Sequence, residues 1–240
     1  MEITMHKYKE LDLKGAAVIN GFPSSGLVNM IVASYLVSVL KLDQICGIDS
    51  EEFPPVCMIY ASKPKFPARI YADAQAKVVV FVSEFTPHPK FARAIARTML
   101  SFAEEAGCTR IISPETLIVE EAGIDLFCIG STDAAREEIK RLGLKPLLHS
   151  IISGISGVLL NEGRIRNYNV IVPLSLRGAE ISDARAAAQV IDVIDKLIPT
   201  IEIDLKPLYM EAERVEKHIK ALRKQIKPED PHEMYEKMYG

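Results

Sequence analysis

The stretch KVVVFVSEF, residues 77–85, decides the fold of this chain, because an unbroken apolar run is followed directly by an amphipathic segment of helix length, residues 90–105. The same alternation occurs elsewhere. GAAVIN (15–20) precedes the segment 26–40, and the apolar runs TRIISPE and DLFCIG precede residues 133–141. Strands that are apolar on both faces and separated by helices are typical of parallel sheets covered on both sides. We therefore predict an α/β fold of three layers, with a mostly parallel sheet and flanking helices.

Two helices have readable starts. Thr132 or Asp133 can cap the helix that follows, and Ser182 or Asp183 can cap another helix that ends before Pro199. The first helix is expected to end at Gly143.

The chain divides into three parts by composition. Residues 1–205 form the α/β domain, in which the proline-containing stretch 55–73 is predicted to be a hairpin or meander and 164–175 a late strand. Residues 206–227 are strongly charged with a periodic apolar pattern. Residues 228–240 carry prolines and acids, a composition that favours a flexible tail over a packed element.

The charged segment is predicted to be a single helix with a heptad seam. Its apolar residues recur at alternating spacings of four and three: Leu208, Ala212, Val215, Ile219, Leu222 and Ile226. Lys227-Pro228 ends the helix. A stripe this narrow suits packing on the chain's own domain as well as packing between protomers, so both roles stay open.

Composition excludes several classes of partner. The formal net charge of -3, from 29 basic and 32 acidic residues, gives no broad basic surface for nucleic acid or an anionic membrane. The apolar run 27–40 is too short and too interrupted by polar residues to span a bilayer, and the mixed N-terminus does not resemble a signal peptide. Four widely spaced cysteines are predicted to be buried, reduced thiols: Cys46, Cys57, Cys108 and Cys128. We expect a cytoplasmic protein.

The segment GFPSSGLVN, residues 21–29, is the first candidate site. A strand, a tight turn and a helix N-terminus can bind an anion through backbone N–H groups. The spacing matches neither standard nucleotide loop, however, since no GK[ST] follows Gly26 and no GxGxxG is present. The preferred interpretation is a turn that Gly21 and Gly26 permit, with Ser24 or Ser25 capping the next helix.

Three further stretches carry polar residues without a complete catalytic set. In residues 83–93, Glu84, His88 and Lys90 could act as acids or bases, although no nucleophile with a positioned base accompanies them. In SPETLIVEEAG, the residues Glu115, Glu120 and Glu121 are predicted to lie in a solvated loop, with no metal-ligand pattern. In residues 153–164, glycines permit either close approach of a ligand or tight backbone packing; they are Gly154 and Gly157. No cofactor motif is evident.

Taken together, GFPSSGLVNMIVASYLV, SEFTPHPKFARAIARTML and SGISGVLLNEGRIRNYNVIVPLS resemble the proteasome assembly chaperone 2 family in its archaeal form, over residues 15–198. The resemblance implies a domain similar to purine nucleoside phosphorylases without their catalytic residues, forming homo-oligomers that engage the proteasome core particle. The chain departs from the pattern in its first loop, where Ser24 and Ser25 replace a glycine and Asn29 replaces another. It also departs in SPETL, which lacks the expected glycines.

The resemblance also gives the tail a role. Met238, Tyr239 and Gly240 look like the hydrophobic-tyrosine-any motif with which archaeal proteasome activators and some assembly chaperones end. The predicted function is therefore that of a non-enzymatic chaperone or regulator whose tail binds the α subunits of the proteasome core. The alternative is a phosphorylase-like or nucleotide-binding enzyme that uses the loops 21–26 and 83–90.

Overall fold

The computed structural model describes residues 2–24, 26–120 and 123–225, with side chains described as far as Lys217. The strands are β1 (Thr4–Lys7), β2 (Ala17–Gly21), β3 (Asp43–Asp49), β4 (Met58–Tyr60), β5 (Lys63–Lys65), β6 (Ala68–Asp73), β7 (Val78–Ser83), β8 (Arg110–Ile112), β9 (Glu115–Val119), β10 (Ile124–Gly130) and β11 (Val170–Gly178). The helices are α1 (Val28–Val39), the short 3-10 helix η1 (Pro89–Phe91), α2 (Ala92–Glu105), α3 (Asp133–Arg141), α4 (Gly154–Arg166), α5 (Asp183–Leu197) and α6 (Lys206–Gln225).

One mixed sheet organises the described part of the chain. Its strand order is β1-β3-β6-β7-β2-β8-β11-β10, and β9 pairs with β11 as well. The strands in the middle are parallel, because β2 pairs parallel with β7 and β8, and β11 pairs parallel with β8 and β9. Antiparallel strands extend the sheet on both sides, β6, β3 and β1 beyond β7, and β10 beyond β11.

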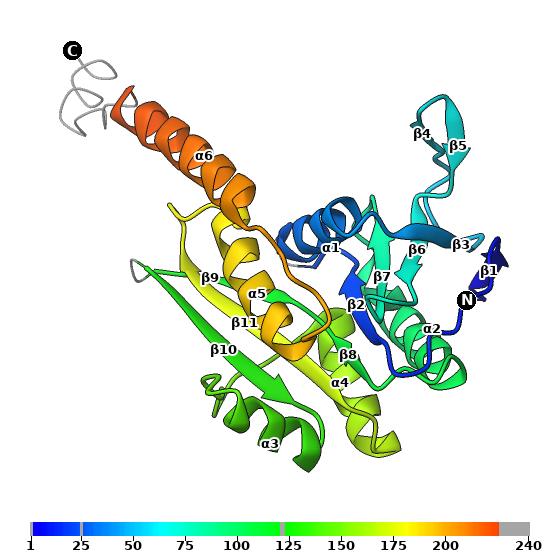
Figure 1. The fold of residues 1–240 in the computed structure, drawn as a ribbon. Coiled ribbons are helices and arrows are strands. Elements are labelled where there is room, and N and C mark those ends of the chain that lie inside the picture. Colours follow the sequence, from blue (N-terminus) through cyan, green and yellow to red (C-terminus); the bar gives the residue numbers. More distant parts are fainter. Residues whose placement is uncertain (1, 25, 121–122, 226–240) are drawn as a thin grey trace, which may run out of the picture.

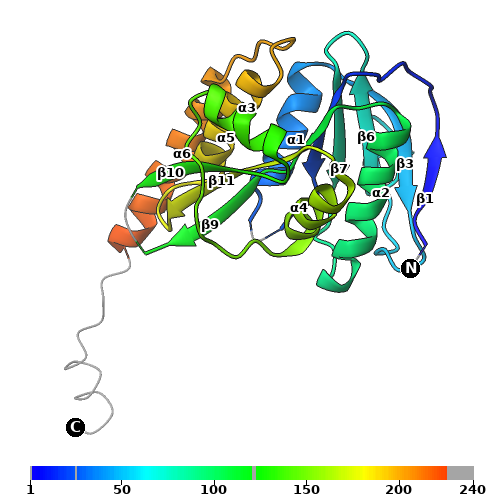
Figure 2. The ribbon, with the colours of Figure 1, turned by 90° about the horizontal axis from the view of Figure 1, so that it is seen from below.

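Helices cover both faces of the sheet, which gives three layers (Figures 1 and 2). Strand β2 shows why, since Ile19 packs into the core under α1 and α5 while Val18 packs into the core under α2 and α4. Both side chains are fully buried. A strand with two apolar faces needs a helix layer on each, as the sequence predicts. The predicted α/β architecture is confirmed.

The caps and the hairpin are confirmed in detail. Thr132 Oγ1 accepts a hydrogen bond from the N–H of Ala135 at the start of α3, and Ser182 Oγ accepts one from the N–H of Arg185 at the start of α5. Within the predicted 55–73 segment, β4 and β5 form an antiparallel hairpin and β6 joins the main sheet.

One prediction is wrong, and one open alternative is resolved. The late strand does not begin at Arg164, because α4 continues to Arg166 and ends at Asn167 in the left-handed conformation, φ 54°. Strand β11 begins only at Val170. The glycine-containing stretch 153–164 is therefore helical, and Gly157 serves tight backbone packing, since a Cβ there would overlap the carbonyl of Ile152. A glycine-rich sequence hides a helix because propensity alone disfavours one, while tertiary packing favours it here.

The thiols follow the prediction with one exception. Cys46, Cys108 and Cys128 are buried, but Cys57 is exposed in the segment leading to β4. Its apolar neighbours in sequence belong to a hairpin that pairs with no strand of the main sheet. Among the described helices, none is both long enough and apolar enough to cross a bilayer.

Candidate functional site

The carboxyl ends of β2 and β8 form the place where a fold of this kind is expected to bind a ligand. After β2 the chain runs through α1 to strands on the β7 side, whereas after β8 it runs to β9 on the β11 side. Adjacent parallel strands whose connections leave in opposite directions open a crevice at their carboxyl ends. In this protein the residues that follow β2 and β8, 22–24 and 113–115, lie at that crevice.

A buried carboxylate lies at the crevice. Glu115 is only 6% exposed. Its Oε2 accepts a hydrogen bond of 2.6 Å from Ser24 Oγ, and its Oε1 accepts one of 2.6 Å from Ser156 Oγ at the start of α4. The carboxylate thus connects the loop after β2 to the helix on the other side of the crevice.

The hydrogen-bond network continues below Glu115. Ser156 Oγ lies 2.7 Å from Ser113 Oγ, which accepts a bond of 2.8 Å from the side-chain amide of Asn20. The amide of Asn29 donates to the carbonyl of Pro114 at 2.6 Å. These side chains are almost completely buried and hydrogen-bonded to one another. The protein therefore fills this part of the crevice with its own polar groups.

The residues of this network include those at which the sequence departs from the resembled family. Ser24 does not cap α1 as predicted, because α1 begins at Val28 with no side-chain cap and Ser24 binds Glu115 instead. Ser25 lies outside the described residues. The prediction of a solvated loop is wrong for Glu115, which is buried at the start of strand β9, and fits Glu120, which is exposed. Glu121 lies outside the described residues.

Burial raises the pKa of the Glu115 carboxyl, while hydrogen bonds from Ser156 and Ser24 act in the opposite direction. No lysine, arginine or histidine of the described residues pairs with it. A carboxyl whose pKa is raised on folding binds a proton more tightly in the folded state. The free energy of unfolding therefore falls as the pH rises from the ordinary glutamate pKa to the raised one.

We accordingly expect Glu115→Gln to stabilise the protein at pH 8 and to have little effect near pH 4, because the amide keeps the shape without the buried charge. Thermal unfolding followed by circular dichroism across this pH range measures the difference. Glu120→Gln, on the exposed side of the same segment, is the matched control and should leave the profile unchanged. A uniform loss of stability in Glu115→Gln at every pH would contradict the assignment.

The loop 83–90 is held by structural contacts. Glu84 forms an ion pair with Arg69, whose side chain is 3% exposed, and accepts a 2.7 Å hydrogen bond from the hydroxyl of Tyr60. His88 Nδ1 accepts a bond from the N–H of Lys90 and so caps η1, and Lys90 pairs with Glu52 at 3.6 Å. Among the described residues, no serine, threonine or cysteine side chain is a hydrogen-bond partner of these three candidate acid-base residues.

A cavity of about 390 Å³ lies where three predicted loops meet. It is bordered by Pro23, Ser24, Thr86, Pro87, His88, Pro89, Ala92, Ser153, Gly154 and Ile155. The structure therefore brings the loops 21–26 and 83–90 and the start of α4 together, as the enzyme alternative requires. Prolines and aliphatic side chains make up much of the wall, however, and His88 is its only ionisable side chain among the described residues.

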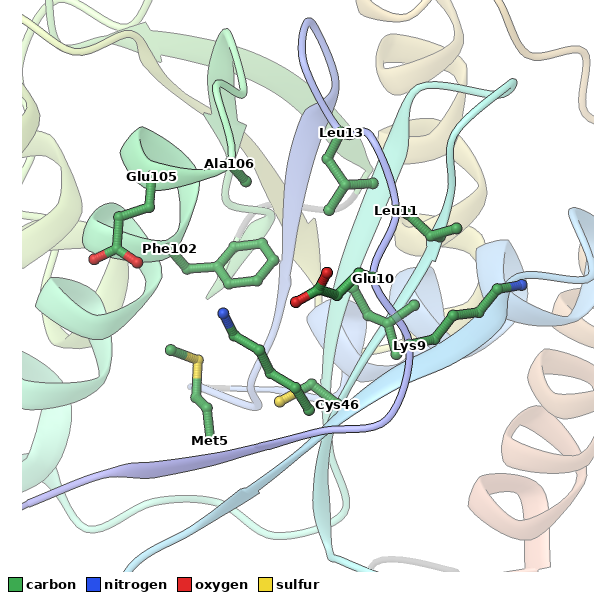
Figure 3. A pocket seen from close by; sticks show the side chains of 11 residues that line it. Met5, Lys9, Glu10, Leu11, Leu13, Cys46, Phe102, Glu105 and Ala106 are labelled. Carbon is green, nitrogen blue, oxygen red and sulfur yellow. The ribbon is translucent and has the colours of Figure 1, made fainter.

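A second cavity, of about 250 Å³, lies between the N-terminal segment and α2 (Figure 3). Its floor includes Leu13, Phe102 and the thiol of Cys46, and Glu10 and Glu105 lie along its walls. Burial raises the pKa of Cys46 to about 11, which keeps the thiol protonated and unreactive at neutral pH. Among the described residues no group of histidine, cysteine and acidic side chains could hold a metal ion.

The predicted heptad helix forms α6, and its first half packs on the same chain. Leu208 and Ala212 are buried against α5, and Val215 is half-buried. The side chains of Ile219 and Leu222, and all of Ile226, lie outside the described residues, as do Met238, Tyr239 and Gly240 of the tail. Figure 1 shows the far end of α6 extending beyond α5.

An ion pair that sequence reasoning missed clamps α6 to α5. Glu216 Oε1 and Oε2 accept bonds of 2.8–3.1 Å from the Arg185 guanidinium. Glu216 Oε1 also accepts bonds from the N–H and hydroxyl of Ser182, the N-cap of α5. The pKa of Glu216 is lowered, first by the hydrogen bond from Arg185. A single arginine in the alanine run of α5 is the sequence signal that could have indicated a partner helix.

Comparisons with known proteins agree with this architecture. The chain is similar to Pyrococcus furiosus PbaA, an archaeal homolog of proteasome-assembly chaperone, with 26% identity, a TM-score of 0.82, and 99% of each chain covered. It shares the fold of P. furiosus PbaB, an archaeal proteasome activator, at 23% identity and a TM-score of 0.80, over 92% of this chain and 99% of PbaB. A proteasome-assembly chaperone homologue of Mycobacterium tuberculosis has the same fold at 15% identity and a TM-score of 0.66, over 91% of this chain and 99% of its own.

A search of curated proteins finds no match. The model of the PAC2 family, however, matches residues 18–223, which include the filled crevice, the clamp and the first part of α6. This chain belongs to the PAC2 family.

Proposed function

We propose that this protein is a non-enzymatic, homo-oligomeric, cytoplasmic factor that binds the α-ring of a proteasome core particle through its C-terminal tail, in assembly or in gate opening. The observation that carries the proposal is the similarity to PbaA over 99% of both chains, within a shared family. The resemblance of PbaB, an activator, adds the gate-opening role.

The crevice supports the non-enzymatic part of the proposal. An enzyme of this architecture needs room for substrate at the carboxyl ends of β2 and β8. Here Glu115, Ser24 and Ser156 satisfy one another's hydrogen bonds at that place. Both oxygens of Glu115 are thus taken by serine hydroxyls, and among the described residues no histidine, lysine or second carboxylate is hydrogen-bonded to Ser24 or Glu115 to complete a catalytic relay.

The tail supplies the chemistry for docking. The carboxylate of Gly240 pairs with a lysine of the α-ring, Tyr239 contributes an aromatic body with a hydroxyl, and Met238 packs on an apolar wall. One such tail binds weakly, because ordering a segment opposes binding. When one tail of an oligomer is bound, the other tails are held close to the remaining sites of the α-ring, which raises their effective concentration there. Self-association is therefore part of the mechanism.

Deleting residues 238–240, or changing Tyr239→Ala, should weaken binding to proteasome core particles by at least about tenfold, as expected for the loss of a buried aromatic anchor. Co-sedimentation and surface plasmon resonance measure the loss. Tyr235→Ala is the matched control, since it removes the same side chain from the same tail but outside the last three residues. Residues added after Gly240 should act like the deletion. Unchanged binding of the deletion variant would falsify the proposal.

The cavity next to Ser24 and His88 is the observation that favours the alternative, a phosphorylase-like or nucleotide-binding enzyme. That alternative predicts stabilisation by a nucleoside, a nucleotide or phosphate in a thermal-shift screen, and a smaller shift in Ser24→Ala. The docking proposal predicts no shift in either protein.

A further inference from the structure

A hairpin that pairs with no strand of the main sheet exposes apolar side chains that the proposed tail docking does not use. We call residues 54–65, which contain β4 and β5, the arm. Its two strands pair with each other and with no strand of the main sheet. Figure 1 shows the arm projecting beyond β3 and β6. A lone two-stranded hairpin is at best marginally stable in water, so an arm of this kind gains from a partner.

The arm carries apolar side chains into solvent. Val56 is 51% exposed, Ile59 64% and Tyr60 42%, next to the exposed thiol of Cys57. Large apolar side chains grouped on one projecting element are typical of interaction surfaces. Burial of these groups against another protein would contribute about 25 cal/mol for each Å² removed from water.

The arm is also held in a defined shape. At its tip, Ala61 and Ser62 both adopt left-handed backbone conformations, φ 48° and 61°, which residues other than glycine rarely do. Next to this tip, Tyr60 donates a hydrogen bond to Glu84, and its ring lies 5.2 Å from the guanidinium carbon of Arg69. The arm is therefore anchored to the domain rather than left loose.

The charges of the arm identify its complement. From Phe53 to Ala72 the sequence has no acidic residue, and Lys63 and Lys65 pair with no carboxylate of the described residues. The ammonium of Lys65 lies over the rings of Tyr60 and Tyr71 instead. The arm therefore presents an apolar surface together with two cations that lack anionic partners.

An acidic hollow of about 440 Å³ lies on the same chain. Its lining is Glu2, Thr4, His6, Asp49, Ser50, Glu51 and Glu52. Glu52 already pairs with Lys90, which leaves Glu2 and Glu51 as the exposed carboxylates that carry the argument. No ion pair joins the arm to this hollow within the described chain.

We propose that the arm of one copy packs on the acidic hollow of a second copy, with Lys63 and Lys65 facing Glu2 and Glu51 of that copy. A chain that carries both complementary surfaces, unpaired with each other, can satisfy them by pairing with itself. The contact specifies the self-association on which the proposed function depends, and it uses a part of the chain separate from the tail.

Two charge-reversed proteins test the contact. One carries Lys63→Glu and Lys65→Glu in the arm, and the other carries Glu2→Lys and Glu51→Lys in the hollow. Each should fall from the mass of the wild-type oligomer to the 26.6 kDa of a single chain in light scattering. Their equimolar mixture should recover the larger mass. The acidic arm of the first variant complements the basic hollow of the second, and the basic arm of the second complements the acidic hollow of the first. Recovery on mixing shows that both variants are folded.

Lys41→Glu with Lys140→Glu reverses two exposed lysines elsewhere and should keep the wild-type mass. A monomeric wild type, an arm variant that keeps the wild-type mass, or a mixture that stays monomeric would each overturn the proposal. The protein lacking residues 238–240 separates this inference from tail docking. This variant should keep the mass of the wild-type oligomer but no longer bind the proteasome core particle. Oligomer mass therefore tests the arm contact, and proteasome binding tests the tail, independently of each other.

Discussion

Gly21→Val is expected to leave the protein unfolded, and Gly21→Ala to remove a large part of its stability. Gly21 is the last residue of β2, and its backbone is outside the left-handed region, so the turn itself does not require glycine. A Cβ at this position would overlap both the Cβ of Ala33 in α1 and the carbonyl oxygen of Phe81 in β7. A backbone carbonyl in a central strand cannot move without breaking the β2–β7 pairing.

The expected cost for Gly21→Ala is about 3–5 kcal/mol, at the upper end for single substitutions, because a well-packed core yields little. That is a large part of the about 5–15 kcal/mol typical of a whole domain. Urea unfolding measures it. The double variant Gly21→Ala with Ala33→Gly should recover only part of the loss, since the overlap with Phe81 remains.

Gly143→Ala is the matched control for this prediction. Gly143 has a positive φ of 66° but open space around its missing Cβ, so its substitution costs only local strain of about 1 kcal/mol. An equal loss of unfolding free energy in Gly21→Ala and Gly143→Ala would contradict the prediction, because it would mean that steric overlap at residue 21 adds nothing to the ordinary cost of replacing a glycine.

Glu216→Ala is expected to release α6 from the domain. The carboxylate is 13% exposed and accepts hydrogen bonds from Ser182 and Arg185 at the start of α5, while Arg185 is 27% exposed. Removing it leaves the guanidinium and the cap of α5 without their partner. We expect a loss of about 2–3 kcal/mol, less than for a fully buried pair because solvent reaches Arg185.

Hydrogen exchange of the amides in residues 206–217 measures this release, because local opening of a docked helix speeds exchange there before the rest of the domain unfolds. Glu213→Ala is the control, because it makes the same Glu-to-Ala change in helix propensity at an exposed position of the same helix. It should leave amide exchange slow. Equal protection in the two variants would show that Leu208 and Ala212 suffice to hold α6. Since α6 leads into residues 226–240, its release should also weaken the proposed docking of the tail.

Local patterns determined much of the fold. The alternation of apolar runs and amphipathic segments predicted the three layers, because a strand with two apolar faces can only be buried between helices. The caps at Thr132 and Ser182 were readable since they depend on neighbours within three residues. The heptad pattern predicted that residues 208, 212 and 215 share one face, but it could not choose between the domain and another protomer.

The candidate site was only partly accessible to such patterns. The loops 21–26 and 83–90 and the start of α4 were each singled out, yet their meeting at one cavity depends on strand order, which no single segment encodes. Glu115 looked like a solvated acid because its segment, SPETLIVEEAG, carries three glutamates and no metal-ligand pattern. Its partners Ser24 and Ser156 lie far away along the chain.

The sequence by itself predicted the alternation of strands and helices in much of the domain, although not helix α4, and its resemblance to the PAC2 family is confirmed. Only the tertiary structure decided that Glu115 is buried, that Glu216 clamps α6 to the domain, and that the strands of the arm pair with no strand of the main sheet. The physical reason is that burial and hydrogen bonding depend on residues remote in the chain, whereas periodicity and capping depend on neighbours.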